Sequence, residues 1–509
     1  MANRSQTNED GLTAAGCTSN QPSSMTRTLI SGTSQLMLSS GVVRLLSIVT
    51  MPILTSLLSP QAYGGAALAG TVISLVSVFA LAGIEMSYAR AYHSAQPPNG
   101  ADVEHYCWRF AILGALLASV VGAVTWWFFN RDSIDQDRRL AILVALGIAF
   151  SVAHTMALTR ARLAVRYRAI ALTLIATGII GAAASIGIAA IWRQDALALL
   201  IPMLLGYLIP VLLLGTPSIA GLAKPSGLTR KEGAALIKIG LAGVVTAPMY
   251  WLLSSSDRWF LQYYHGAEAV GVYSIGYSVG IVGMMINGAI ISVWLPEAAR
   301  EYEQDPERAR ATLGGLMHRL MVLMALIWLV VAAAGGDIVR WLANERFHAA
   351  ADYVPYIAGG VFFYGVLRLA DTGLLIAKQL KWAALWWLAG GVVCTVLNVA
   401  LVPRYGGLGA AITQSIGFAF MSIGIFSTAQ TKFPVCLGWS RLAINIAMIL
   451  AASLVMIHPW HATAPISLLM KLPFGIVVAA ISIWIAAPDW FARGIEYLRQ
   501  RETACDRLS

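Results

Sequence analysis

Residues 169–191 read AIALTLIATGIIGAAASIGIAAI, an apolar run without a charged side chain. About twenty such residues in a helix match the ~30 Å hydrocarbon core of a lipid bilayer. Runs of this length recur with short gaps along the chain, so we expect about fourteen membrane spans. Their predicted bounds are 35–58, 65–87, 110–129, 140–158, 169–191, 196–215, 234–256, 269–293, 316–335, 354–377, 383–402, 407–428, 442–457 and 467–487. The chain is predicted to be an all-α polytopic membrane protein.

The composition argues against most soluble functions. Hydrophobic residues make up 58% of the 509 residues and charged residues only 12%, and the mean hydropathy is +0.69. Spans and short connections leave no room for a separate soluble catalytic domain. The net charge of +10 is concentrated at span ends, where lipid headgroups and topology account for it, so no nucleic-acid partner is expected. Five scattered cysteines predict neither a metal site nor disulfides.

The basic residues predict the orientation of the chain. Of the 35 Lys and Arg residues, 24 fall on the termini and alternate connections, 9 fall on the opposite connections, and Arg44 and Arg368 lie inside spans. Because Lys and Arg are retained in the cytoplasm, both termini are expected there. The segments 1–34 and 488–509 are then cytoplasmic tails, and the first is expected to be disordered.

A weak internal repeat predicts two lobes. Span two follows Ser59-Pro60-Gln61-Ala62-Tyr63-Gly64, and span eight begins within Gly266-Ala267-Glu268-Ala269-Val270-Gly271, with glycines at matching places. An offset of six spans preserves orientation and predicts parallel repeats. We expect an N-lobe over 35–215, a cytoplasmic linker over 216–233 and a C-lobe over 234–428, followed by spans thirteen and fourteen within 429–487.

Prolines inside two spans are candidate hinges. Pro52 in span one and Pro248 in span seven each remove a backbone hydrogen bond and can bend the first helix of a lobe. The alternative is that these positions reflect the ordinary tolerance of membrane helices for proline.

Four groups of short motifs occur in order along spans one to twelve. They are Arg44-Leu45-Leu46-Ser47 with Pro52-Ile53-Leu54-Thr55, Leu58-Ser59-Pro60 and Tyr63-Gly64; Gly83-Ile84-Glu85 with Arg90-Ala91-Tyr92; Asp257-Arg258-Trp259-Phe260 with Val270-Gly271-Val272-Tyr273-Ser274; and Leu397-Asn398 with Pro403, Tyr405-Gly406-Gly407 and Gly409-Ala410-Ala411. In these motifs the chain resembles the polysaccharide-transporter family. This family comprises the O-antigen and exopolysaccharide flippases of the multidrug/oligosaccharidyl-lipid/polysaccharide exporter superfamily.

The resemblance implies a fold and a cargo. The fold would be two six-helix lobes plus two C-terminal helices, with a central cavity that opens alternately to each side of a bacterial cytoplasmic (inner) membrane. The cargo would be an undecaprenyl-pyrophosphate-linked oligosaccharide, moved outward for export of a surface polysaccharide without any bond being made or broken. Membrane lipids, a polysaccharide polymerase and a co-polymerase would be its partners. The protein is therefore not expected to be an enzyme.

Two arginines inside spans are candidates for the cargo site. A charge in mid-span costs ~2.5–3.5 kcal/mol on insertion scales and normally faces a polar cavity or a partner. We expect Arg44 to meet the pyrophosphate, because a guanidinium pairs bidentately with phosphate; snorkelling to headgroups or a pair with Glu85 is the alternative. Arg368 and Asp371 lie three residues apart on one face of span ten. They form either a structural pair or a site in which Arg368 binds cargo and Asp371 serves a coupling ion.

Charged residues near span ends are further candidates. Asp257 and Arg258, near the outer end of span seven, are expected in a gate, a hinge or ion coupling, with interfacial solvation as the alternative. Glu85 and Arg90 end span two at the cytoplasmic mouth. There Arg90 is a third candidate for cargo binding and Glu85 for gating, and a simple interfacial pair is the competing interpretation.

Other functions and energy sources compete. A multidrug/cation antiporter of the same superfamily would share the fold but would favour an acidic cavity, whereas the deep charges here lean basic. A membrane glycan polymerase or ligase would need a large outer loop, and the longest outer connection, 336–353, is short. We expect no cofactor and no ATP-binding loop. Transport could draw on the membrane potential or on a proton or sodium gradient.

Overall fold

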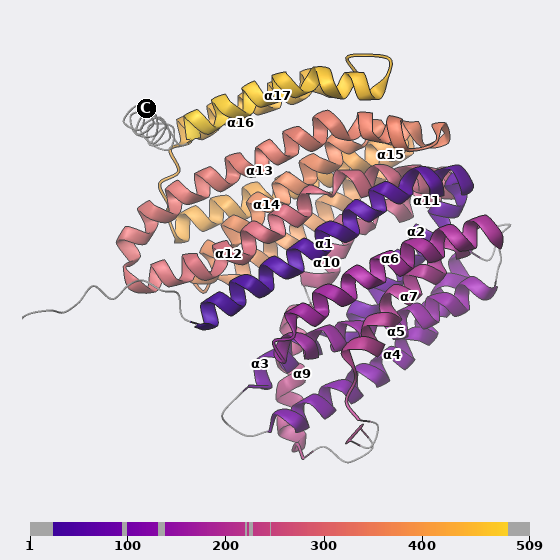
Figure 1. Cartoon of the computed structure of the whole chain (residues 1–509). Coiled ribbons are helices and arrows are strands. Elements are labelled where there is room, and N and C mark those ends of the chain that lie inside the picture. The colour runs from indigo at the N-terminus through magenta and orange to yellow at the C-terminus, as the bar shows by residue number, and fades with distance from the viewer. Residues whose placement is uncertain are drawn as a thin grey trace, which may run out of the picture.

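The computed structural model describes residues 24–93, 99–130, 138–218, 221–222, 227–244 and 246–486, and every regular element in these ranges is a helix (Figure 1). Eleven of the helices are long and apolar enough to cross a membrane, or twelve when one bent pair is counted as a single span. The prediction of an all-α polytopic membrane protein is confirmed. Most of the two predicted tails, and part of the predicted linker, lie outside the described residues.

Seven helices form the first half of the bundle. They are α1 (Ser24–Leu57), α2 (Pro60–Leu81), α3 (Ile84–Ala91), α4 (Gly100–Asn130), α5 (Arg138–Leu163), α6 (Tyr167–Ile191) and α7 (Leu197–Leu214). Ser59 is the N-cap of α2, and Pro60 occupies its first turn. α2 ends where Ala82 and Gly83 both adopt left-handed backbone, with φ of 46° and 72°. The predicted span 65–87 is therefore divided between α2 and the short α3.

The second half contains longer helices, two of which reverse at glycines. The elements are α9 (Arg230–Val244), α10 (Thr246–Ser255), α11 (Asp257–Gly280), α12 (Gly283–Gln304), α13 (Pro306–Leu342), the 3₁₀ helix η1 (Glu345–Asp352), α14 (Val354–Ile376) and α15 (Leu380–Lys432). Non-helical backbone interrupts α11 at Gly266 (φ 80°, ψ 177°) and α15 at Gly406 (φ 54°, ψ −130°). Both conformations are readily available to glycine alone.

α15 is a helical hairpin and contains two crossings. Trp386 donates its indole N–H to the hydroxyl of Thr428 at 2.9 Å, 42 residues further along the same element. A Cβ at Gly390 would lie 2.3 Å from the Met421 side chain, so the two arms pack antiparallel around the break. The arms coincide with the predicted spans 383–402 and 407–428, which explains why the helix count falls below the predicted number of spans.

The described parts of the predicted seventh span, 234–256, are α9 and α10, which have different neighbours. α9 begins four residues earlier than predicted, because Thr229 and Glu232 form a capping box in which the Glu232 carboxylate accepts the Thr229 N–H at 2.7 Å. These hydrogen bonds from Thr229 lower the pKa of Glu232 below its usual range. α9 packs against α3, where the Ser87 hydroxyl donates to the Leu236 carbonyl at 2.6 Å. α10 packs against α15, and Pro248 lies in its first turn.

Two C-terminal helices, α16 (Trp439–Met456) and α17 (Ala464–Ala486), lie along α13 at one side of the bundle (Figure 1). Lys471, one of the nine basic residues that the sequence places on the opposite connections, lies within α17 with its side chain 3% exposed. Its ammonium group is 2.7 Å from Asp337 of α13 and donates to the Ala333 carbonyl at 3.1 Å. Ser467 donates to the same carboxylate at 3.0 Å. A buried ion pair thus fixes α17 to α13.

Removing one partner of this pair should destabilise the C-terminal helices. Lys471→Met leaves the Asp337 charge buried, and breaking such a pair typically costs about 3–5 kcal/mol. The protein in detergent should lose this much free energy of unfolding in a denaturant titration. Lys432→Met, at an exposed position, is the control. The double variant Asp337→Leu/Lys471→Met should regain most of the loss, and a single variant as stable as wild type would contradict the assignment.

Candidate functional site

The two halves meet where α2 crosses α11. A Cβ at Gly64 would lie 1.8 Å from the Ala267 carbonyl oxygen, and a Cβ at Gly271 would lie 1.7 Å from the Pro60 carbonyl oxygen. The contact is reciprocal, because Pro60 and Gly64 of one repeat face Ala267 and Gly271 of the other. Such mutual contact is expected around a two-fold axis. The glycines that the sequence repeat singled out are thus the residues that allow the backbones to touch.

Further contacts join the halves at the same end of the bundle. The backbone N–H of Asn344, just before η1, donates to the Thr55 hydroxyl of α1 at 3.1 Å. The rings of Tyr63 and Phe347 meet edge to face, with centroids 5.3 Å apart. In Figure 1 the two groups of helices converge here and diverge toward α3, α9 and α12. We call this contact region, built around Gly64 and Gly271, the lobe seal.

A cavity of about 340 Å³ lies between α1, α6 and α7 of the first half and α11 of the second. Three helices each contribute two hydroxyl groups to its wall: Ser47 and Thr50 from α1, Thr177 and Ser185 from α6, and Ser274 and Ser278 from α11. Four of these hydroxyls donate to carbonyls of their own helix, which leaves oxygen lone pairs available. We call this space the hydroxyl cavity.

Arg44 of α1 is half-buried, adjoins Val43, which lines the hydroxyl cavity, and lies near Tyr277 of α11. It forms no salt bridge within the described ranges, so the sequence alternative of a pair with Glu85 has no support there. The neutral phenol supplies no anion, so the positive charge of the guanidinium is not balanced by a neighbouring negative charge.

A row of tyrosines extends from Arg44 to Arg368. The Tyr250 ring of α10 packs against the Tyr364 ring of α14 with centroids 5.6 Å apart, and Tyr277 lies near Tyr250. Tyr364 in turn interacts with the charges of Arg368 and Asp371. We call Tyr277, Tyr250 and Tyr364 the tyrosine row. It places one arginine from each half along the interface between the halves.

Arg368 and Asp371 form the ion pair that their spacing predicts, with 3.3 Å between Nη1 and Oδ2. The Arg368 side chain is 37% exposed and that of Asp371 is 19% exposed. The second Asp371 oxygen, Oδ1, has no hydrogen-bond partner in the described part of the chain. The pair is therefore not fully buried, and one carboxylate oxygen has no hydrogen-bond partner among these residues. The guanidinium can still donate to a ligand, and the carboxylate can still bind an ion.

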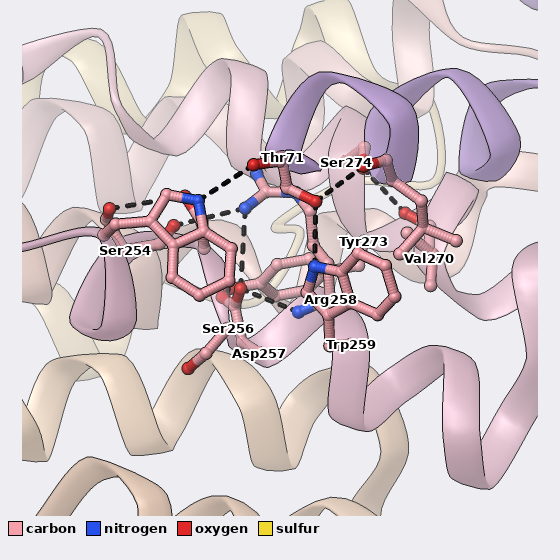
Figure 2. A network of polar contacts seen from close by, with 12 residues as sticks. Thr71, Ser254, Ser256, Asp257, Arg258, Trp259, Val270, Tyr273 and Ser274 are labelled. Carbon is pink, nitrogen blue, oxygen red and sulfur yellow. Dashed lines mark hydrogen bonds and ion pairs between the residues drawn. The ribbon is translucent and has the colours of Figure 1, made fainter. Parts of the chain in front are cut away.

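Asp257 and Arg258 lie in the interior and not at a solvated interface. The two residues are 2% and 7% exposed. Arg258 donates to the Ser254 carbonyl at 3.2 Å and lies 3.5 Å from the Asp257 carboxylate (Figure 2). Tyr273 donates its hydroxyl to the other Asp257 oxygen. The guanidinium also stacks on the Tyr277 ring at 4.2 Å, and Arg44 lies near the same tyrosine.

Figure 2 shows a second link between the halves on the far side of this pair. The indole N–H of Trp259 donates to the Thr71 hydroxyl of α2 at 2.9 Å. The indole N–H of Trp251 donates to the Thr71 backbone carbonyl at 3.1 Å. One threonine thus holds two tryptophans of the opposite half.

The other predicted site residues lie apart from this cluster. Arg90 is exposed and Glu85 half-buried on α3. No ion pair joins them in the described ranges, and neither contacts the tyrosine row in any recorded interaction. Pro52 lies inside α1, whose helix continues through it. No group of three or more His, Cys, Asp or Glu residues that could hold a metal occurs in the described part of the chain.

Sequence reasoning missed the tyrosines and Thr71. The three residues of the tyrosine row come from three separate helices, and no motif joins them along the chain. Tyr273 belongs to the same motif group as Arg258, and Tyr277 follows Tyr273 by four residues, which is a signal for a shared helical face. Thr71 carries no such signal, because it is one hydroxyl within an apolar span.

The chain is similar to proteins of polysaccharide and glycan biosynthesis. It matches the family described as "Polysaccharide biosynthesis protein" over residues 53–352. It is 22% identical over 256 residues to the probable low-salt glycan biosynthesis flippase Agl15 of Haloferax volcanii. That match covers 49% of this chain and 53% of the relative, so the chain spans about half the length of the curated protein it matches.

Solved structures share the fold. The lipid II flippase MurJ in an inward closed conformation superposes with a TM-score of 0.70 at 13% identity, covering 89% of this chain and 99% of that one. An inward-facing multidrug resistance transporter of the MATE family, in the MOP superfamily, gives 0.52 at 12% identity over 82% of this chain and 99% of that one. Because the family match covers more than half of the 509 residues, the chain belongs to the family described as "Polysaccharide biosynthesis protein".

Proposed function

We propose that this protein is a flippase that moves an undecaprenyl-pyrophosphate-linked oligosaccharide from the inner to the outer leaflet of a bacterial cytoplasmic membrane. The observation that carries the proposal is Arg44, an unneutralised cation beside the hydroxyl cavity, with Arg368 of the other half along the same interface. A pyrophosphate and a sugar headgroup cannot cross hydrocarbon unaided. A cationic, hydroxyl-lined space between the halves lets them cross while the isoprenoid tail stays in lipid.

In this proposal the lobe seal closes the outer end of the path. The positive-inside rule puts both termini and the α3, α9 and α12 end in the cytoplasm, where the halves diverge. Cargo would come in from that side, and separation of Gly64 from Gly271 would release it outward. A polysaccharide polymerase and co-polymerase on the outer side would use the delivered units. Because no bond changes, no catalytic group is required.

Energy for outward movement can come from the membrane itself. An inside-negative potential favours outward transfer of an anion by about 2.3 kcal/mol per charge per 100 mV. A proton or sodium ion moving inward is the alternative, and the carboxylates of Asp257 and Asp371 are its candidate sites. Asp371 is the better placed, since one of its oxygens has no partner among the described residues.

Arg44 should be needed for transport and not for folding. Cells lacking the protein should accumulate lipid-linked repeat units on the inner leaflet, and the wild-type chain should clear them. Arg44→Ala should clear them at least tenfold more slowly at equal membrane abundance, because a charge-assisted contact contributes about 1.5–3 kcal/mol. Arg44→Lys should recover part of the rate, since it keeps the charge but loses the bidentate geometry.

Arg300→Ala, which removes an exposed arginine paired with Glu297, is the control and should behave as wild type. Full clearance by Arg44→Ala would contradict the assigned cargo site. Normal delivery of repeat units in cells without the protein would contradict the function itself. Loss of drug resistance in those cells, with normal glycan export, would favour the multidrug exporter.

A side chain at the crossing should open the lobe seal. Gly64→Leu places atoms where the Ala267 carbonyl lies, so the outer ends must separate. A cysteine introduced at Ser274, in the hydroxyl cavity of a variant without other cysteines, should then react faster with a membrane-impermeant maleimide added outside. Gly288→Leu, at a position with no atom within 4 Å, should leave the rate unchanged. An equal rate in monodisperse Gly64→Leu protein would show that the crossing does not close the outer path.

A further inference from the structure

A second cavity, of about 620 Å³, lies between α2 and α4 of one half and α10 and α11 of the other. It shares no lining residue with the hydroxyl cavity. Its volume falls within the ~300–1,000 Å³ typical of small-molecule sites. We call it the aromatic cleft, because its wall on α10 and α11 contains five aromatic side chains: Trp251, Trp259, Phe260, Tyr263 and Tyr264. The proposed transport path, built on the two arginines, assigns it no role.

The two walls of the cleft differ in chemistry. The α2 wall is aliphatic, with Leu68, Val72 and Val76 among its residues. On α11, Trp259 and Tyr263 are four residues apart, as are Phe260 and Tyr264, so the rings form two adjacent rows along the helix. A cleft shaped only to hold hydrocarbon has no need for such a concentration of flat rings on one side.

The tryptophan rings of this wall are held in place. Each indole has a single N–H donor, and both donors bind Thr71 on the opposite wall, at 3.1 Å for Trp251 and 2.9 Å for Trp259. Tyr263 and Tyr264 meet edge to face with centroids 4.8 Å apart, and Tyr263 is 82% exposed at the surface. Fixed rings lose little conformational freedom when a ligand binds, which favours affinity.

One polar group in the cleft lacks a partner. Gln262 lines the cleft, and its buried side-chain oxygen accepts no hydrogen bond from the described residues. An unsatisfied buried acceptor destabilises the empty protein and favours a ligand that brings a donor. A sugar hydroxyl is such a donor, whereas an acyl or isoprenoid chain has none.

We propose that the aromatic cleft binds sugar rings of the cargo, a proposal that rests on the proposed function. A pyranose has an apolar C–H face that stacks on an aromatic ring and a hydroxylated edge that reaches Gln262. Tyr250 of the tyrosine row and Trp251 of the cleft are consecutive residues of α10, so their side chains leave the helix about 100° apart and the row and the cleft lie on neighbouring faces of one helix. The pyrophosphate and the sugars of one molecule can therefore occupy both places at once.

The test compares two ligands on the full-length protein in nanodiscs. The first is farnesyl pyrophosphate, and the second is farnesyl pyrophosphate linked to glucose, galactose or N-acetylglucosamine. Wild type should bind the glycosylated forms more tightly than the free lipid. Gln262→Leu should weaken binding of the glycosylated forms about tenfold, the equivalent of one good hydrogen bond, and leave farnesyl pyrophosphate unchanged. Gln304→Leu, at the exposed end of α12, is the matched control.

A second variant keeps the test informative if Gln262→Leu does not fold, and each result of the binding measurements leads to a different conclusion. Tyr263→Ala removes an exposed ring and should also weaken only the glycosylated ligands. Equal binding of all ligands by wild type, or an unchanged preference in both variants, would overturn the sugar site alone. A loss of affinity for farnesyl pyrophosphate as well in Tyr263→Ala would mean that the cleft holds the lipid tail. No binding of any isoprenoid pyrophosphate by wild type would overturn the proposed function.

Discussion

The close approach of two backbones at Gly64 and Gly271 determines the geometry on both sides of it. Within lipid, helices associate through packing and hydrogen bonds, and small residues allow their axes to come close. Here each glycine lies against a carbonyl of the opposite repeat, so no larger side chain fits without separating the helices. Because α2 and α11 are fixed at this point, the hydroxyl cavity and the aromatic cleft both border them, one toward α1 and the other toward α10.

Among the described residues, three intramembrane basic residues are paired with carboxylates, whereas Arg44 is not. Arg258 is paired with Asp257, Arg368 with Asp371, and Lys471 with Asp337. Pairing is expected, since an isolated charge in a medium of low dielectric constant is costly. Arg44 instead faces Tyr277 and has no carboxylate partner in the described ranges. Arg44 lies at the interface between the halves, and under the proposed function an anionic cargo would take the partner's place there.

Much of the fold was predictable from the sequence. The apolar runs fall within helices, although α4 (Gly100–Asn130) and α13 (Pro306–Leu342) extend beyond the predicted spans 110–129 and 316–335. The sequence repeat also pointed to positions 64 and 271, which are in contact. The all-α fold and the family resemblance are confirmed by the structure and the comparisons. The different neighbours of α9 and α10, both parts of the predicted seventh span, were not predictable, because only tertiary packing determines them.

The charged residues of the site could be predicted from the sequence, whereas its neutral residues could not. Charged residues are rare in membrane spans because the bilayer excludes them, so Arg44, Arg368 and Asp371 can be recognised as candidates from the sequence alone. Tyrosine, threonine and glutamine are tolerated in spans for many reasons. Tyr250, Thr71 and Gln262 can therefore be recognised as site residues only when the structure shows which residues lie beside them. The role of Lys471 was hidden in another way, because it lies close enough to a span end to resemble a loop residue.

The uncompensated charge of Arg44 also bears on how the conformational change would be coupled to cargo binding. Arg44 and Arg258 approach the same phenol, Tyr277, from opposite halves, and only Arg258 has a carboxylate of its own. Closing the halves around an empty cavity would remove water from Arg44 and bring two like charges closer, which raises the free energy of the closed state. A bound pyrophosphate removes both penalties. Under the proposed function, the same arginine that recognises the cargo therefore disfavours alternation without it.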